Sequence, residues 1–307
     1  MSERRGKGGG AAGYAGGRDA PPLSKSRAEV AKAEAAGRRK EGGAPPEPPR
    51  PLWREYAESA VVVAVMALFF MTFVGQAATV PTASMQNTIL VGDHFLINKF
   101  IFAPGPHVPF LPQRDIRRGD IIVFKYPSDI DTNEQVVRFK TNYIKRVIGM
   151  PGDTIEVRGA QVLINGTPLA EHRVESTVGR DARNRLSDKA ELEVLQDPPR
   201  REGEPPYSVY YSPETMRLPP DRFEQTDYFN FAVNGRPVVV PENNYFVMGD
   251  SREFSSDSRR WGFVPRHLVV GRALFVIWSY DESAASGNFF SDFFRNTRWR
   301  RTGTVLR

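Results

Sequence analysis

The sequence predicts a mainly β protein, with an antiparallel or mixed sheet, anchored by one N-terminal transmembrane helix. Three observations support this prediction: a long uncharged run near residue 60, a series of short β-branched and aromatic segments after it, and no strong amphipathic helix between those segments. Because parallel strands need long, usually helical, crossovers, the third observation disfavours a βαβ arrangement. The chain of 307 residues is long enough to bury a core.

The first predicted element is the transmembrane helix, at residues 56–79. No charged residue occurs between Glu58 and Asp93, and the first part of this stretch is almost wholly apolar. About 20 apolar residues span roughly 30 Å as a helix, which matches the hydrocarbon core of a bilayer. A cleavable signal peptide is disfavoured because a long polar segment precedes the run. A buried helix of a soluble protein is disfavoured because the run is apolar on every face.

Residues 1–55 are predicted to be a disordered basic tail. Residues 1–50 hold 11 Lys or Arg against 6 Asp or Glu, together with ten Gly and six Pro, a composition that cannot bury a core. The positive-inside rule places this tail in the cytoplasm and everything after the helix outside. We expect no nucleic-acid partner, because Tyr14 is the only aromatic residue among the first 50.

Eight segments after residue 80 are short, β-branched and aromatic, as is typical of strands. They are residues 94–100, 120–126, 142–149, 154–158, 162–166, 236–240, 244–248 and 268–280. The fourth and fifth read as a hairpin, with a further turn at Asn165 and Gly166. We therefore assign residues 80–169 and 236–282 to one catalytic β domain.

Two segments differ in composition from that domain. Residues 170–235 are charged and rich in Pro-Pro turns, and we assign them to an inserted subdomain that is β-rich or irregular. Residues 283–307 form a basic aromatic C-terminal tail, in which Phe and Trp alternate with Arg. Contact with anionic lipid and a frayed terminus are both open for this tail.

The absence of cysteine excludes a thiol nucleophile, a disulfide framework and a Cys-ligated metal. The four histidines, His94, His107, His172 and His267, form no helical pair and no HExxH pattern. A zinc hydrolase is therefore disfavoured, and we expect neither a metal ion nor a cofactor.

Four segments carry candidate chemistry: PTASMQNT at 81–88, RGDIIVFKYP at 118–127, YIKRVIGMPGD at 143–153 and MGDSREFSSDSRRWGFVP at 248–265. In this order, behind a membrane anchor, they resemble the sequence boxes of bacterial type I signal peptidases of peptidase family S26. Members of this family are membrane-bound serine endopeptidases that remove signal peptides from exported preproteins with a Ser–Lys dyad. Four ordered matches are far more specific than any one of them.

The resemblance implies a role for each matching residue. Ser84 is the implied nucleophile and Lys145 the implied general base. Thr82, with the backbone N–H of Ser84, falls on the oxyanion hole, and Ser255 falls on the serine that hydrogen-bonds and orients the lysine. The implied supporting ion-pair group comprises Arg146, Asp257 and Arg259. Shallow pockets for the small side chains of an Ala-x-Ala substrate are implied at Val80, Pro81, Met85, Ile89, Tyr143 and Ile144.

Two positions depart from the family pattern. Thr82 stands where the family usually has a serine, and Asn87 stands where a proline is common. Threonine keeps the hydroxyl that an oxyanion hole needs, although β-branching restricts its rotamer. Asn87 leaves the geometry of the local turn open, and we expect it to leave the chemistry unchanged.

The implied base must be neutral at the pH of catalysis. A solvated lysine has a pKa of about 10.4, so a pKa near 7 requires roughly 4–5 kcal/mol, which burial of the ammonium can supply. Strand alternation is expected to send Lys145 to the face opposite Ile144 and Arg146. We expect Asp257 to neutralise Arg146 and so to stabilise the strand.

The resemblance also implies an environment. It is the bacterial inner membrane, crossed once, with the N-terminus in the cytoplasm and the catalytic domain on the periplasmic face. The expected partners are the signal peptides of preproteins and the lipid bilayer, with the translocation machinery as a further candidate.

Three alternatives stay open. A Ser–His–Asp hydrolase is disfavoured because no Gly-x-Ser-x-Gly pattern surrounds Ser84. A self-cleaving repressor with a Ser–Lys dyad is disfavoured because a membrane anchor removes it from DNA. An inactive membrane-tethered adaptor is disfavoured by the joint presence of Ser84, Lys145, Ser255 and Asp257.

Overall fold

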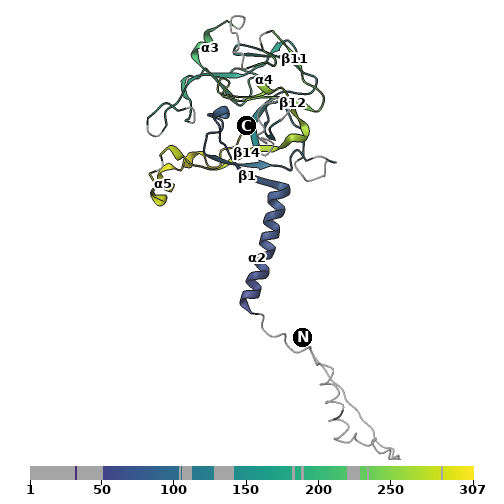
Figure 1. Cartoon of the computed structure of the whole chain (residues 1–307), viewed down its shortest axis with the longest axis vertical. Coiled ribbons are helices and arrows are strands. Elements are labelled where there is room, and N and C mark those ends of the chain that lie inside the picture. Colours follow the sequence, from purple (N-terminus) through teal and green to yellow (C-terminus); the bar gives the residue numbers. More distant parts are fainter. Residues whose placement is uncertain are drawn as a thin grey trace, which may run out of the picture. The chain divides into compact units, whose positions relative to one another are not determined.

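The structure is a computed structural model. It describes residue 32 and residues 51–103, 105, 113–127, 142–181, 184–187, 190–219, 229–233, 235–284 and 286–307. It divides into two units, residues 1–62 and residues 63–307, and every strand of the described chain lies in the second unit (Figure 1). The predicted tail, apart from residues 32 and 51–55, lies outside the described residues, as do His107 and residues 220–228.

The apolar run forms a helix from Leu52 to Val74, 23 residues that are long and apolar enough to cross a membrane. Its first part is α2 (Leu52–Phe69), and its last turn, Phe70–Val74, is π-helical. None of the side chains in α2 is buried. The helix ends earlier than the predicted residue 79, because Gly75–Thr79 forms strand β1. These small residues pair with a neighbouring strand, and a Cβ on Gly75 would lie only 3.2 Å from Leu96 Cδ1.

The largest sheet has seven strands in the order β1-β2-β14-β3-β4-β12-β13, and all six neighbouring pairs are antiparallel. The prediction of a mainly β protein is confirmed. In addition to β1, the strands are β2 (Asp93–Asn98), β3 (Ile121–Lys125), β4 (Asn142–Gly149), β12 (Asn244–Met248), β13 (Val264–Pro265) and β14 (Val269–Ser279).

A second sheet contains the predicted hairpin. Its order is β11-β5-β6-β7, with β11 (Val238–Val239), β5 (Thr154–Arg158), β6 (Gln161–Ile164) and β7 (Thr167–Pro168). The turn between β6 and β7 contains Asn165 at φ 52° and Gly166 at φ 78°. Both residue types tolerate this left-handed conformation, which explains why the turn could be predicted.

The predicted inserted subdomain holds a third sheet, in the order β10-β8-β9. Its members are β8 (His172–Thr177), β9 (Glu193–Gln196) and β10 (Ser208–Tyr211), and helix α3 (Pro213–Arg217) follows them. The β10–β8 pair is parallel and the β8–β9 pair antiparallel, so this sheet is mixed. One short helix, α4 (Ser258–Trp261), follows β12 in the chain.

Strand β4 is buried on both faces, since six consecutive residues from Ile144 onward are buried. Burial therefore does not alternate along β4 as it would in a half-buried strand. β4 lies between β3 and β12 in the interior of the largest sheet, and apolar clusters cover it. Both Lys145 and Arg146 consequently lie in the protein interior and need polar partners there.

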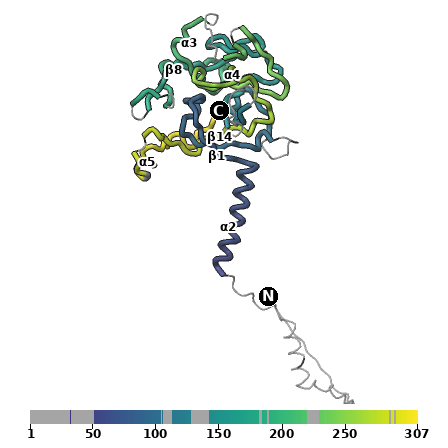
Figure 2. Tube along the Cα trace, viewed as in Figure 1, coloured from purple at the N-terminus to yellow at the C-terminus, as the bar shows by residue number. Residues whose placement is uncertain are grey.

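The C-terminal segment packs on the domain rather than fraying. Helix α5 (Phe289–Asn296) and the 3₁₀ turn η6 (Trp299–Arg301) precede a terminus that returns to the interior, where Leu306 is buried and Val305 pairs with Phe275. Figure 2 shows this end of the chain over the centre of the folded unit. The exposed Phe290 and Phe294 leave lipid contact as a prediction for the segment.

Candidate active site

Ser84 lies in the 3₁₀ turn η2 (Ala83–Met85), which follows β1, and only 4% of its surface is exposed. Its carbonyl oxygen accepts a hydrogen bond from Ser251 N at 3.2 Å. Gly249 lies against the same carbonyl, and a Cβ there would come within 2.3 Å of the oxygen. Because only glycine permits this approach, the motif at 248–265 holds the Ser84 turn through its backbone.

Lys145 reaches Ser84 from the buried strand β4. Its Nζ donates hydrogen bonds to Ser84 Oγ at 2.6 Å and to Ile144 O at 3.0 Å, and 2% of the residue is exposed. Burial lowers the pKa of Lys145 to about 8, against the opposing influence of the Asp257 and Asp250 carboxylates. The structure therefore brings together the two residues implied as nucleophile and base.

Thr82 and the backbone of Ser84 lie where an oxyanion could be held. Thr82 Oγ1 is 3.4 Å from Ser84 Oγ, and Thr82 precedes the turn in an extended conformation. The N–H of Ser84 belongs to the first residues of a 3₁₀ helix, which have no partner within the helix. Two donors therefore adjoin the Ser84 hydroxyl.

Asp257 pairs with Arg259. It caps the N-terminus of α4, and its carboxylate accepts hydrogen bonds from Arg259 Nε and Nη2, both at 2.9 Å, and from Gly249 N at 3.1 Å. Burial raises the pKa of Asp257, but Arg259 and the hydrogen bonds outweigh burial and hold the pKa below its usual value. Asp257 thus stays ionised beside the Gly249 backbone.

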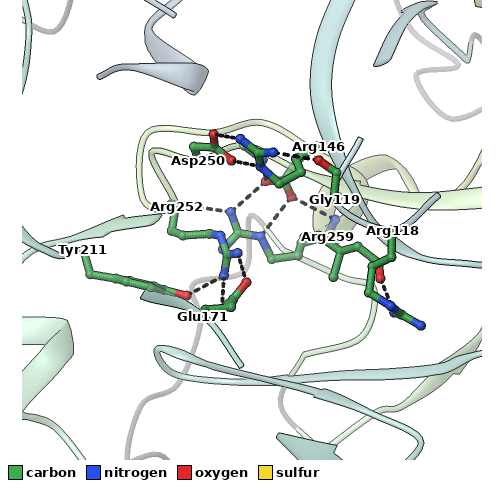
Figure 3. Close-up of polar contacts among 11 residues, drawn as sticks. Arg118, Gly119, Arg146, Glu171, Tyr211, Asp250, Arg252 and Arg259 are labelled. Carbon is green, nitrogen blue, oxygen red and sulfur yellow. Dashed lines mark hydrogen bonds and ion pairs between the residues drawn. The ribbon is translucent and has the colours of Figure 1, made fainter. Parts of the chain in front are cut away.

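Arg146 does not pair with Asp257, and the expected ion pair is wrong. Its Nε and Nη2 donate to the two carboxylate oxygens of Asp250 at 2.7 and 2.6 Å, and its Nη1 donates to Gly119 O at 2.7 Å. The Arg146 and Asp250 side chains are 0% and 1% exposed (Figure 3). Asp257 is already engaged by Arg259, so the neighbouring carboxylate of the same motif neutralises Arg146.

Ser255 is buried beside the site, at 2% exposed, but the implied hydrogen bond to Lys145 is not formed in the described structure. Its Oγ lies against Gly249, where a Cβ would meet it at 2.3 Å. Ser255 Oγ is therefore buried without a hydrogen-bond partner among the described residues.

Four of the six implied pocket residues share one apolar cluster. They are Val80, Met85, Ile89 and Ile144, all buried. Tyr143 is half-buried, with its ring centroid 5.9 Å from Lys145 Nζ, and Pro81 is exposed. The cluster forms an apolar wall behind the Ser84 turn.

Sequence reasoning missed two ionic partners in the site. Asp250 was within a recognised motif but had no assigned role, and Glu171 lies in the predicted inserted subdomain. Glu171 pairs with Arg252, and the two side chains are 0% and 1% exposed (Figure 3). A buried arginine needs an anionic partner, so burial of Arg252 would indicate that a carboxylate lies next to it. Nothing local in the sequence indicates which carboxylate it is.

The histidines that the structure describes do not reach Ser84. His94 stacks on Trp278 with ring centroids 4.9 Å apart, and His172 lies between Asp197 and Glu204. The side-chain partners of Ser84 Oγ in the described chain are Lys145 and Thr82. A Ser–His–Asp triad at Ser84 therefore has no support.

Comparison with known proteins shows the family of the chain. A family model described as "Signal peptidase, peptidase S26" matches residues 53–278. Signal peptidase I of Pseudomonas aeruginosa is 30% identical over 242 residues, covering 74% of this chain and 73% of the relative. Signal peptidase I of Aquifex aeolicus is 32% identical over 71% of this chain and 81% of the relative. That of Rickettsia prowazekii is 31% identical over 74% of this chain and 80% of the relative.

The mainly β fold, the apolar N-terminal helix and these relatives together define a membrane-anchored protease. The chain belongs to the signal peptidase family, peptidase S26. Processing of signal peptides is the activity of this family, and the prediction of the family from four motifs is confirmed.

Proposed function

We propose that this protein is a signal peptidase I that cleaves preproteins with Ser84 as nucleophile and Lys145 as general base. The observation that carries the proposal is the 2.6 Å hydrogen bond between Lys145 Nζ and Ser84 Oγ inside the protein. A serine hydroxyl needs an adjacent base to attack a peptide carbonyl, and a lysine with a pKa of about 8 supplies one near neutral pH.

The reaction follows from these positions. The neutral amine of Lys145 accepts the proton of Ser84 Oγ as that oxygen bonds to the carbonyl carbon. Thr82 Oγ1 and the N–H of Ser84 donate to the resulting oxyanion. Collapse of the intermediate breaks the peptide bond, and the ammonium of Lys145 returns its proton to the leaving amine. Water, activated by the same amine, then hydrolyses the ester and restores the Ser84 hydroxyl.

We propose a preference for small side chains before the cleaved bond, of the Ala-x-Ala type. The apolar wall of Val80, Met85, Ile89 and Ile144 supports this preference. An apolar wall next to the nucleophile favours apolar side chains such as that of Ala over charged ones, because burial of an unpaired charge is costly.

The proposed location is the bacterial inner membrane, with the N-terminus in the cytoplasm and the catalytic domain on the periplasmic face. The apolar helix that ends at Val74 supports a membrane anchor, and the basic residues before it support the orientation. Ser84 follows the helix by only ten residues. A signal peptide held in the same bilayer would therefore meet the nucleophile at a high effective concentration.

The decisive experiment uses the purified full chain in detergent with a peptide that contains Ala-x-Ala. The wild-type protein is expected to cleave after the second Ala, and Ser84→Ala and Lys145→Arg are expected to reduce cleavage to background, because guanidinium cannot act as a base. Full activity of Ser84→Ala would contradict the mechanism. Absence of cleavage by the wild-type chain would instead favour the inactive adaptor.

A further inference from the structure

Asn87, three residues after Ser84, joins the nucleophile turn to the inserted subdomain. Its Nδ2 donates to Leu192 O at 3.1 Å, and its Oδ1 accepts from Leu192 N at 2.8 Å. The side-chain amide thus satisfies both backbone groups of one residue, as a neighbouring strand would. The adjacent Gln86 donates from Nε2 to Ala190 O. Leu192 is 4% exposed, and the two hydrogen bonds of Asn87 are partly buried.

The backbone of Asn87 explains why an asparagine is suited to this position. Its φ is 67°, in the left-handed region. Proline cannot adopt this angle, because its ring holds φ near −65°. Asparagine tolerates it better than other residues with a Cβ, and also supplies the paired donor and acceptor. Side chain and backbone angle together fit the contact with Leu192.

The inserted subdomain also holds the opposite side of the Ser84 turn. Strand β10 pairs with the motif at 248–265, because Tyr210 N donates to Asp250 O at 2.8 Å and Arg252 N donates to Tyr210 O at 3.1 Å. Between these two residues, Ser251 N donates to the carbonyl of Ser84. The segment that holds the nucleophile turn is therefore itself paired with the inserted subdomain.

A buried ion pair reinforces this second contact. Arg252 Nη1 donates to Glu171 Oε2 at 3.0 Å and to Tyr211 Oη at 2.8 Å, and Arg252 and Glu171 are both almost completely buried (Figure 3). Glu171 immediately precedes β8, and Tyr211 ends β10. Arg252, which follows Ser251, thus binds the start of β8 and the end of β10 in the inserted subdomain.

We propose that the inserted subdomain positions the nucleophile turn through two contacts, Asn87 with Leu192 and Arg252 with Glu171, and that Asn87 and Glu171 are positioning residues for catalysis. This inference rests on the proposed role of Ser84. The turn η2 has only three residues and cannot fix the hydroxyl by its own hydrogen bonds. A displacement of about 1 Å from an attacking geometry costs on the order of 100-fold in rate, so outside support is needed.

The primary test compares Asn87→Gly with Asn165→Gly. Glycine accepts a positive φ, so both changes keep the backbone and remove only the side-chain amide. Asn165 is a matched control, because it has φ 52° and two amide contacts, from Thr154 N at 2.8 Å and to Asp153 Oδ1 at 3.1 Å. No hydrogen bond joins its hairpin turn to Ser84 in the part of the chain that the structure describes. Asn87→Gly is expected to lower kcat on the Ala-x-Ala peptide 10- to 100-fold with KM within twofold, and Asn165→Gly to leave both within twofold.

A second measurement does not depend on activity. Hydrogen exchange of the backbone amides at residues 84–89 is expected to accelerate at least tenfold in Asn87→Gly and to stay unchanged in Asn165→Gly. Glu171→Gln is expected to accelerate exchange in the same segment. Since it leaves the buried charge of Arg252 without its counter-charge, exchange is measured under conditions in which the variant is folded.

The outcomes separate the two proposals. If Ser84→Ala is inactive while Asn87→Gly keeps wild-type kcat and exchange, the positioning role is wrong and the nucleophile stands. Equal losses in Asn87→Gly and Asn165→Gly would also overturn the positioning role, because any turn asparagine would then serve. If Ser84→Ala retains full activity, the proposed function fails and the positioning role fails with it.

Discussion

Lys145 Nζ lies 2.6 Å from Ser84 Oγ, although the two residues are 61 positions apart in the chain. The lysine is in an interior strand of the largest sheet, and the serine is in a turn held against it by Gly249 and Ser251. Burial of the amine is what lowers its pKa, so the same packing that brings the pair together also prepares the base.

The pH dependence of cleavage should report the amine of Lys145. The neutral form is active, so kcat/KM is expected to rise about tenfold per pH unit below the pKa of about 8 and to level off above it. Assays of the peptide from pH 5 to pH 10 check this. Lys145→Arg should be inactive throughout, and a profile that is flat across this range would count against the lysine.

Lys145→Met should stabilise the fold at neutral pH. The folded pKa of Lys145, about 8, lies below the ordinary lysine value of 10.5, so the unfolded chain binds the proton more tightly and the stability of the wild-type fold rises with pH between these values. The gain in unfolding free energy should be up to about 3 kcal/mol at pH 7 and should vanish by about pH 10.5. Urea unfolding of both chains at the two pH values measures it. If the two chains differed in unfolding free energy by the same amount at pH 7 and at about pH 10.5, burial of the charged Lys145 amine would not destabilise the fold.

The Arg146–Asp250 pair should be needed for folding. Asp250→Asn leaves a completely buried guanidinium without its counter-charge, which costs about 3–5 kcal/mol in unfolding free energy. Glu156→Gln is the matched control, since it removes the carboxylate of an exposed pair with Arg158, and no measurable change is expected. Denaturant unfolding compares the two variants, and similar effects would show that burial of the pair does not matter.

Thr82 should contribute through its hydroxyl. Thr82→Val keeps the β-branched shape and removes the donor, so kcat is expected to fall about 100- to 1000-fold with little change in KM. Thr82→Ser keeps the donor and should stay within about tenfold of wild type. Steady-state kinetics on the peptide measure both. If Thr82→Val were as active as Thr82→Ser, the Thr82 hydroxyl would not stabilise the oxyanion.

The anchor should matter for membrane-bound substrates. Deletion of residues 1–74 keeps β1 and should leave peptide cleavage intact while weakening the processing of preproteins in vesicles. A longer deletion, of residues 1–80, also removes β1 and the buried Val80, so it should impair both reactions. Parallel assays of the two deletions on the two substrates check this. Equal loss on both substrates for the shorter deletion would contradict an effect of tethering.

The sequence by itself determined the apolar helix, most strands of the β domain and the four motifs of the family. These depend on local properties, namely apolar length, β-branched composition and the turn residues Asn165 and Gly166. The end of the helix at Val74, however, could not be predicted from local properties. Gly75–Thr79 forms a strand because it pairs with β2, which lies further along the chain.

Only the tertiary structure decided which charges pair, and which contacts the inserted subdomain makes. Arg146 meets Asp250, and Arg252 meets Glu171 from a distant segment, while Asn87 binds the backbone of Leu192. A motif shows that a buried cation requires a carboxylate, but several carboxylates satisfy that requirement equally. The choice among them depends on which strands come together in space, and this is a property of the whole packed chain rather than of any segment.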